Sequence, residues 1–454
     1  MKRKKKPAPA AKKKAKSVKK VQSSKPKHAK KAKSTKATPS KRIAPPPPAP
    51  PFGGKRQFAE PAYVPLAKGT TNTGNVNEYD AYVNSGVLQP IPPPRQGSNM
   101  VVKLSDVIGQ DAVDSITKSG QLVFHSVGDT GADKEYRVKD EDDVAAMMAH
   151  DLMNAAENER PAFFFHLGDV VYEFGQASSY YAHFYEPYCT YNAPIFAIPG
   201  NHDGMIWDPS MTTLQAFLDN FCAAVPAPSP NAGGLIRSTM NQPGVYFTLE
   251  APFASIIGLY SNVSDKGAGV ISSENGRYPN ITDDQKNFLI SELKRLRPAR
   301  NANQTAVILA VHHPVFDGSK TPQALCKDLD DAFEKAGLYP DVVLTGHAHI
   351  YERFERTVNG KTIPYIIAGC GGYNLLSAAK NSSPNQKVPA ALQHVQGLKA
   401  YIKAFGYLKV KATKNKLAVI FNCLDKTYGD AADSIVIDLQ THQITEGTKN
   451  KEPL

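Results

Sequence analysis

Five short apolar segments of this chain each end in a cluster of polar residues, and this repeated pattern limits the folds that the chain can adopt. Continuous apolar runs of this length are typical of strands that are buried on both faces of a sheet. Segments with helical periodicity lie between several of them, as in 283–296, where Phe288, Leu289 and Leu293 share one face. The pattern predicts buried strands at 122–124, 162–165, 194–198, 306–311 and 342–344.

The C-terminal part of the chain has a different pattern. Residues 406–413 and 417–424 alternate around a short polar turn, which is typical of an antiparallel hairpin. Residues 244–249 and 254–259 form a second pair of this kind. Strand, polar turn and helix in alternation indicate an α/β (α+β) protein. We therefore expect a β-sandwich of two mixed sheets flanked by helices.

Charge is divided unevenly along the chain. Residues 1–56 contain 21 of the 54 Lys and Arg residues and no Asp or Glu. The rest of the chain has 33 basic and all 42 acidic residues, a net charge of −9. A Lys/Ala/Pro-rich segment cannot bury enough apolar surface to offset the entropy of ordering it, so we predict a disordered basic tail. Its composition resembles that of linker-histone tails, which favours binding to DNA, RNA or another polyanion. A tail that serves only solubility is an equal alternative.

The composition therefore predicts three segments: a basic tail at 1–56, a Pro/Gly-rich extension or linker at 57–118, and a globular catalytic domain at 119–454. No apolar run reaches the roughly 18 residues of a spanning helix, so we expect no membrane span. The basic start is not followed by the apolar region of a signal peptide, and we expect a cytoplasmic protein.

The polar clusters all follow predicted strands, and ligands of α/β folds bind at the carboxyl ends of strands. We therefore expect one convergent site. Carboxylates, an amide, imidazoles and a phenol, without a thiolate, are ligands for iron, manganese or zinc. Seven donors, one of them a carboxylate that can bridge, suit two ions, and ions about 3.5–4 Å apart can hold both oxygens of a phosphoryl transfer. The candidate ligands are Asp129, Asp169, Tyr172, Asn201, His312, His347 and His349.

These residues lie in five motifs that, in this order, resemble the motifs of calcineurin-like metallophosphoesterases. The position of Tyr172, three residues after Asp169, and the segment 349–353 are similar in particular to purple acid phosphatases. The resemblance covers residues 121–375. Its motifs are Asp129-x-Gly131, Gly168-Asp169-x-x-Tyr172, Gly200-Asn201-His202-Asp203, His312-x-Pro314 and Gly346-His347-x-His349.

The resemblance implies two metal sites that share Asp169. It implies an Fe(III) site of Asp129, Tyr172, His349 and Asp169, and a site for Zn, Mn or Fe made of Asn201, His312, His347 and Asp169. A tyrosinate ligand favours Fe(III) and would colour the protein purple. Metal-bound hydroxide would attack phosphorus, and His202, oriented by Asp203, would donate a proton to the leaving group.

The resulting interpretation is a dinuclear phosphoesterase that hydrolyses phosphate monoesters, similar to acid phosphatases. One alternative is a phosphodiesterase acting on nucleotides or other diesters, because the same metal centre would serve either substrate. The loops at 204–240 and 261–280 would decide between them. An alternative of another class is a polyanion-binding protein whose main functional element is the tail.

Several residues allow a plainer interpretation. We predict that His125 and His166 are hydrogen-bonded core residues rather than ligands. His313 could face a phosphate or pack inward. Tyr172 could be a packed aromatic residue, in which case zinc or manganese would fill both sites.

Overall fold

The computed structural model describes residues 89–95, 99–132, 135–206, 211–261, 269–276, 278, 281–316, 324–376, 387–429 and 431–447. The predicted basic tail lies outside these residues. Within the described part of the chain, no helix combines the length and the apolar character needed to cross a membrane.

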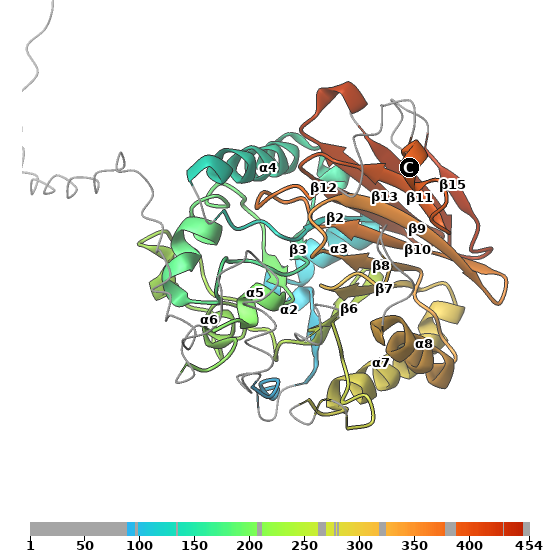
Figure 1. The fold of residues 1–454 in the computed structure, drawn as a ribbon, viewed down its shortest axis with the longest axis horizontal. Coiled ribbons are helices and arrows are strands. Elements are labelled where there is room, and N and C mark those ends of the chain that lie inside the picture. Colours follow the sequence, from blue (N-terminus) through green and yellow to red (C-terminus); the bar gives the residue numbers. More distant parts are fainter. Residues whose placement is uncertain are drawn as a thin grey trace, which may run out of the picture. The chain divides into compact units, whose positions relative to one another are not determined.

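Two mixed β-sheets pack face to face, with helices on their outer faces (Figure 1). The order of the larger sheet is β1 (Val101–Lys103), β5 (Phe247–Ala251), β6 (Phe253–Leu259), β7 (Thr305–Val311), β8 (Val342–Thr345), β10 (Lys361–Ala368), β9 (Tyr351–Val358) and β11 (Leu398–Ile402). The order of the smaller sheet is β15 (Ile444–Glu446), β14 (Asp433–Asp438), β13 (Lys416–Cys423), β12 (Gly406–Thr413), β2 (Gln121–Val127), β3 (Phe164–His166) and β4 (Ile195–Ala197).

The predicted sandwich is confirmed, and so are its five buried strands. β2, β3 and β4 run parallel in one sheet, and β6, β7 and β8 run parallel in the other. The two predicted hairpins are also present, as the antiparallel pairs β12–β13 and β5–β6. Each parallel group therefore presents the carboxyl ends of its strands at one edge of its sheet.

Apolar side chains fill the space between the sheets and the space beneath the helices. Phe124, Phe165 and Ile308 belong to the core between the two sheets and are completely buried. On the outer faces, α7 (Asp284–Asn301) and α8 (Ala324–Ala336) pack on the larger sheet, and α4 (Glu135–Asn154) packs on the smaller one (Figure 1). Leu289 and Leu293 of α7 are buried, as their common face predicted. Burying one such side chain stabilises the fold by about 1.5–3 kcal/mol.

The N-terminal described residues are part of the same body. β1 pairs in parallel with β5 at the edge of the larger sheet. Two helices follow, α2 (Ser105–Ile108) and α3 (Gln110–Ser119), and their apolar side chains pack against the core between the sheets. Arg95 donates hydrogen bonds to three main-chain carbonyls, those of Cys222, Ala223 and Asn241. The described part of the segment 57–118 thus supplies an edge strand and the residues of two helices.

Shorter helices occupy the connections between these elements. They are α5 (Asn201–Gly204), α6 (Gln215–Phe221), the π-helix η3 (Tyr181–Tyr185) and the 3₁₀ helices η1 (Glu157–Glu159), η2 (Ala177–Ser179), η4 (Pro230–Ala232), η6 (Ala390–Leu392) and η7 (Lys426–Tyr428).

The hairpin of β9 and β10 was not among the predicted elements. Its turn is Asn359-Gly360, and both residues have positive φ, at 51° and 78°. An Asn-Gly pair between strands is a strong hairpin signal, so the sequence did contain the information.

A buried ion pair from this hairpin connects the two sheets. Arg353 of β9 donates through Nε to Asp433 Oδ2 of β14 over 2.7 Å, and the Tyr351 hydroxyl donates to the same oxygen over 2.9 Å. All three residues are buried. The part of the 349–353 segment that follows His349 therefore stabilises the sandwich.

Candidate dinuclear metal centre

The predicted site residues follow the carboxyl ends of five strands, and the structure brings them together. Asp129 follows β2, Asp169 and Tyr172 follow β3, Asn201 follows β4, His312 follows β7, and His347 and His349 follow β8. Two groups of side chains could each hold a metal ion. One is Asp129, Asp169 and His349, the other is Asp169, His312 and His347, and within each group the ligand atoms all lie within 4.8 Å of one another.

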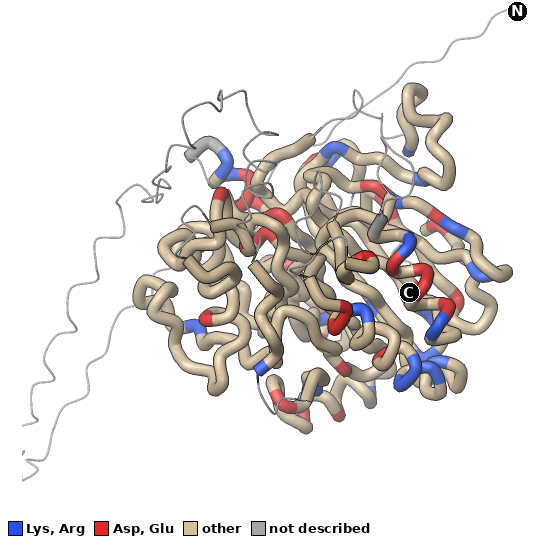
Figure 2. Tube along the Cα trace, turned by 60° about the horizontal axis from the view of Figure 1, so that its bottom comes forward, with Lys and Arg blue, Asp and Glu red and all other residues tan. Residues whose placement is uncertain are grey.

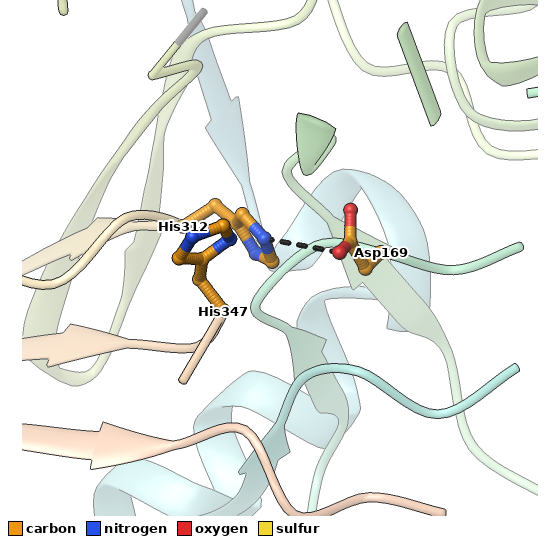
Figure 3. A group of neighbouring side chains, drawn as sticks. All are labelled: Asp169, His312 and His347. Atoms are coloured by element: carbon orange, nitrogen blue, oxygen red, sulfur yellow. Dashed lines mark ion pairs between the residues drawn. The ribbon is translucent and has the colours of Figure 1, made fainter. Parts of the chain in front are cut away.

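Asp169 belongs to both groups, so one carboxylate lies between two possible metal positions. Figure 3 shows this carboxylate facing the rings of His312 and His347. His312 Nε2 lies 3.3 Å from Asp169 Oδ2, and His347 Nδ1 lies 2.9 Å from the side-chain oxygen of Asn201. Asn201 therefore extends the second group.

Tyr172 extends the first group. Its hydroxyl oxygen lies 3.0 Å from an oxygen of Asp129, 3.0 Å from an oxygen of Asp169, and 3.4 Å from His349 Nε2. The His349 Nε2 atom is itself 3.3 Å from Asp129 Oδ1. The ring of Tyr172 is packed, but its hydroxyl points at both carboxylates.

The tautomer of His312 is suited to binding a metal. Its Nδ1 atom lies 2.8 Å from the main-chain oxygen of Leu167. A carbonyl can only accept, so Nδ1 carries the proton and the lone pair is on Nε2. In the neutral ring, this buried Nε2 atom makes no hydrogen bond within the described residues, and it lies 3.3 Å from Asp169 Oδ2. A buried acceptor without a partner costs free energy, and a cation at this position would satisfy it.

Burial and charge also favour cations here. Asp129 and Asp169 are both completely buried, which is costly for carboxylates unless positive charge lies nearby. Burial alone would lower the pKa of His312, but Asp169 and Asp129 outweigh it and raise that pKa to about 9. Burial and the same two carboxylates raise the pKa of Tyr172 well above its ordinary value. A bound cation would reverse this effect on the phenol by stabilising its anion. The donor set therefore fits two ions.

Backbone geometry at the site leaves little space. Asp129, Asp169 and His347 have positive φ, at 57°, 53° and 65°, which costs non-glycine residues about 1–3 kcal/mol. Glycines beside them allow close approach of the loops. A methyl group on Gly346 would lie 2.5 Å from an oxygen of Asp129, and one on Gly200 would collide with the carboxylate of Asp169.

His202 is held beside the shared carboxylate. Its main-chain N–H donates to Asp169 Oδ1 over 2.8 Å. Its ring Nδ1 lies 2.6 Å from the main-chain oxygen of Glu173, so Nδ1 carries a proton and Nε2 is the nitrogen left for proton transfer.

The expectation that Asp203 orients the His202 ring is wrong. The Asp203 carboxylate accepts hydrogen bonds from three main-chain N–H groups, those of Val170, Val171 and Gly200. Burial and the charge of Asp169 raise the pKa of Asp203 to about 7. Asp203 thus holds the loop after β3 against the start of α5.

His125, His166 and His313 are the other histidines for which the sequence suggested a role. His166 is hydrogen-bonded to Thr130 Oγ1 and to the Gly168 N–H, and His125 to Asp151 and Tyr191, so their prediction as core residues is confirmed. The ring of His313 is completely buried and lies 4.2 Å from the ring of His347. Its Nδ1 atom lies 2.7 Å from Ser261 Oγ.

Sequence reasoning missed three residues around Tyr172. The ring of Tyr373 stacks on that of Tyr172, with centroids 3.5 Å apart and planes 5° apart. The Tyr373 hydroxyl donates to Glu173 Oε1 over 2.9 Å, and the Arg137 guanidinium lies 4.2 Å from the Tyr373 ring centre. The segment Gly369–Gly372 precedes Tyr373, and the Gly371 N–H donates to the main-chain oxygen of Gly128 over 3.1 Å.

The glycine contact at Asp169 gives a direct test of the metal centre. Gly200 has φ of −94°, which alanine adopts freely, so Gly200→Ala acts through the added methyl group alone. We expect it to displace the Asp169 carboxylate and to lower the metal content well below about two ions per chain, measured by elemental analysis. Gly244→Ala is the control, because Gly244 also lies outside the left-handed region and a methyl group there would come no closer than 3.2 Å to another residue, Pro94. Full metal content in Gly200→Ala would contradict the shared role of Asp169.

Several solved structures are similar to this chain at low sequence identity. GAP50, the anchor in the inner membrane complex of Plasmodium, is 16% identical, with a TM-score of 0.45 over 73% of this chain and 90% of that chain. A purple acid phosphatase from yellow lupin is 16% identical, with a TM-score of 0.46 over 70% and 54% of the two chains. A dimetal phosphatase from Danio rerio is 12% identical, with a TM-score of 0.40 over 66% and 95%.

Among curated proteins, none matches the chain significantly in sequence. The sequence profile of the calcineurin-like phosphoesterases matches residues 124–351, half of the chain. This span begins in β2 and ends at the start of β9, so it contains all seven candidate ligands and His202. The chain belongs to the calcineurin-like phosphoesterase family.

Proposed function

We propose that this protein hydrolyses phosphate monoesters at a dinuclear centre in which Asp169 bridges the two ions. Family membership implies a metal-dependent hydrolase of phosphoric esters. The observation that carries the proposal is the position of Asp169 in both groups of candidate ligands. When bound, two such ions would activate a water molecule and neutralise charge on the phosphoryl group.

The side chains divide the work between holding the ions and moving a proton. Asp129, Tyr172 and His349 complete one site, and Asn201, His312 and His347 complete the other. His202 is the proton donor for the leaving group, because its Nδ1 atom is fixed on Glu173 and its Nε2 atom remains for the reaction.

Tyr172 supports iron as one of the two ions. Its hydroxyl lies at hydrogen-bond distance from two candidate ligands, Asp129 and Asp169, so a phenolate at this position would bind the same cation as they do. A phenolate stabilises Fe(III), and the other site would then hold Zn, Mn or Fe(II). If Tyr172 were only a packed aromatic, zinc or manganese would fill both sites.

Diesters are the alternative substrates, since the metal centre serves both reactions. The choice depends on the loops at 204–240 and 261–280, of which 207–210, 262–268, 277, 279 and 280 lie outside the described residues. We favour monoesters because the position of Tyr172, three residues after Asp169, is similar to that in purple acid phosphatases. His202, beside the bridging carboxylate, can protonate the leaving group of either substrate.

Metal analysis with a visible spectrum tests the centre most directly. We expect about two metal ions per chain, a broad tyrosinate-to-iron absorption in the visible range, and faster turnover of aryl phosphate monoesters than of diesters. Asp169→Asn should abolish hydrolysis, because a carboxamide bridges two cations poorly. A colourless, active protein that contains only zinc would refute the iron assignment, and faster turnover of diesters would refute the monoester assignment.

Leaving-group dependence tests His202. In His202→Ala, turnover of an alkyl monoester should fall at least about tenfold more than turnover of a nitrophenyl monoester, because only the alkoxide needs a proton to leave. A general acid contributes about 10²–10⁴-fold to such a step. Metal content should be unchanged and serves as the control. Equal losses for both substrates would exclude the proton-donor role.

We further propose that the basic tail binds a polyanion. The support is the segregation of charge: 21 basic residues and no acidic ones lie in 1–56, whereas acidic residues are distributed widely over the described body (Figure 2). Binding of this kind releases counterions and is therefore weakened by salt.

Comparison of the full chain with a truncated chain that begins at residue 57 tests the tail. The full chain should bind double-stranded DNA at low salt, with an affinity that falls steeply as salt rises, and the truncated chain should not. Monoester hydrolysis should be equal in both chains, which shows that truncation leaves the catalytic domain intact. Equal DNA binding by both chains would locate the polyanion site elsewhere.

A further inference from the structure

We propose that Tyr373 and Glu173 form a positioning pair that fixes the orientation of Tyr172 and His202. The inference rests on the proposed function, because it assigns these two residues to support one candidate ligand and the candidate proton donor. Tyr373 lies 24 residues after the last candidate ligand, and the sequence motifs do not include it.

The first contact of the pair is the ring stack. Tyr373 and Tyr172 lie face to face, with centroids 3.5 Å apart and planes 5° apart. Because Tyr172 covers one face of the Tyr373 ring, the Arg137 guanidinium, 4.2 Å from the ring centre, lies on the other face. The Tyr373 ring lies between two planar groups and therefore cannot tilt. It in turn restricts the plane of the Tyr172 ring that stacks on it.

The second contact connects the stack to His202. The Tyr373 hydroxyl donates to the Glu173 carboxylate over 2.9 Å, and the main-chain oxygen of the same Glu173 lies 2.6 Å from His202 Nδ1. Glu173 therefore connects Tyr373 on one side with the candidate acid on the other. A hydrogen bond to a charged carboxylate is stronger than one between neutral groups, which suits it to fixing a loop.

Tyr373 is itself anchored to the candidate ligands. Its main-chain N–H donates to the main-chain oxygen of Asp129 over 3.1 Å, and its ring lies edge-on to that of His349 at 5.1 Å. The pair thus transmits the position of the β2 and β8 loops to the loop after β3. Catalytic groups must be held within about 0.5 Å of their working positions. The ring stack would hold Tyr172 in this way, and the hydrogen bond to Glu173 would hold His202.

Two variants separate the contacts. Tyr373→Phe keeps the ring and removes the hydroxyl, and Tyr373→Leu removes the ring as well. Tyr373→Phe should lower turnover of an alkyl monoester about tenfold, with a much smaller loss for a nitrophenyl monoester and unchanged Zn²⁺ affinity. Tyr373→Leu should in addition weaken binding of one of the two Zn²⁺ ions about tenfold, measured by chelator competition, because Tyr172 is no longer held.

Combination with His202→Ala distinguishes positioning from a general loss of structure. If Tyr373 acts on the alkyl substrate through His202, then Tyr373→Phe should have no further effect in the His202→Ala background. Glu173→Gln keeps an acceptor for the Tyr373 hydroxyl and should retain most activity, whereas Glu173→Ala should behave like Tyr373→Phe. Tyr185→Phe is the matched control, since it removes a buried hydroxyl bonded to Asn220 in the core and should not change the substrate ratio.

Each outcome supports or overturns the positioning role of Tyr373 and Glu173. Equal losses of turnover on both substrates in Tyr373→Phe, or losses that add to those of His202→Ala, would overturn the link through Glu173. Unchanged Zn²⁺ affinity in Tyr373→Leu would overturn the role of the ring stack. Failure of the proposed function would appear in the unmodified protein, as absence of monoester hydrolysis. The Zn²⁺ measurement does not need that activity, so the two failures are distinguishable.

Discussion

The site depends on one buried carboxylate, that of Asp169, which must lie beside side chains from both sheets. Asp169 follows β3 of the smaller sheet, yet it lies 3.3 Å from His312, which follows β7 of the larger sheet. Both side chains are buried, so neither charge nor lone pair can be satisfied by water. The sandwich must therefore align the carboxyl ends of its two parallel strand groups, and the ion pair of Arg353 with Asp433 helps to fix that alignment from β9 to β14. The positive φ of three candidate ligands is the local cost of the arrangement.

Much of the fold was predictable because buried parallel strands and their polar ends leave a clear pattern. The five strands, the hairpin of β12 with β13 and the helical face of α7 all follow from apolar periodicity. β1 has only three residues and is stabilised by pairing with β5, which lies about 150 residues later, so local pattern could not reveal it. The hairpin of β9 and β10 differs from β1, because its signal lies in the local sequence. The Asn359-Gly360 turn is a local hairpin signal, so this hairpin was predictable from the sequence.

For the site, motifs predicted which side chains meet but not what holds them. The candidate ligands lie at strand ends, where topology alone makes them converge. Asp203 was expected to orient its neighbour His202, but in a helical turn adjacent side chains point in different directions. Its carboxylate is used by main-chain N–H groups, and the main-chain oxygen of Glu173 takes the role instead. Tyr373 and Glu173 are 200 residues apart, and no periodicity or spacing relates them.

Charge acts on two separate scales in this protein. The net charge of −9 outside the tail would repel an anionic substrate at long range, but salt limits that repulsion to roughly 8–10 Å. Within the site, two ions held by a few carboxylates would leave a local excess of positive charge, which salt screens much less in a buried setting. Attraction of a phosphate is therefore a local property of the metal centre. Under the proposal that residues 1–56 bind a polyanion, their 21 positive charges would affect where the enzyme is held rather than how it reacts.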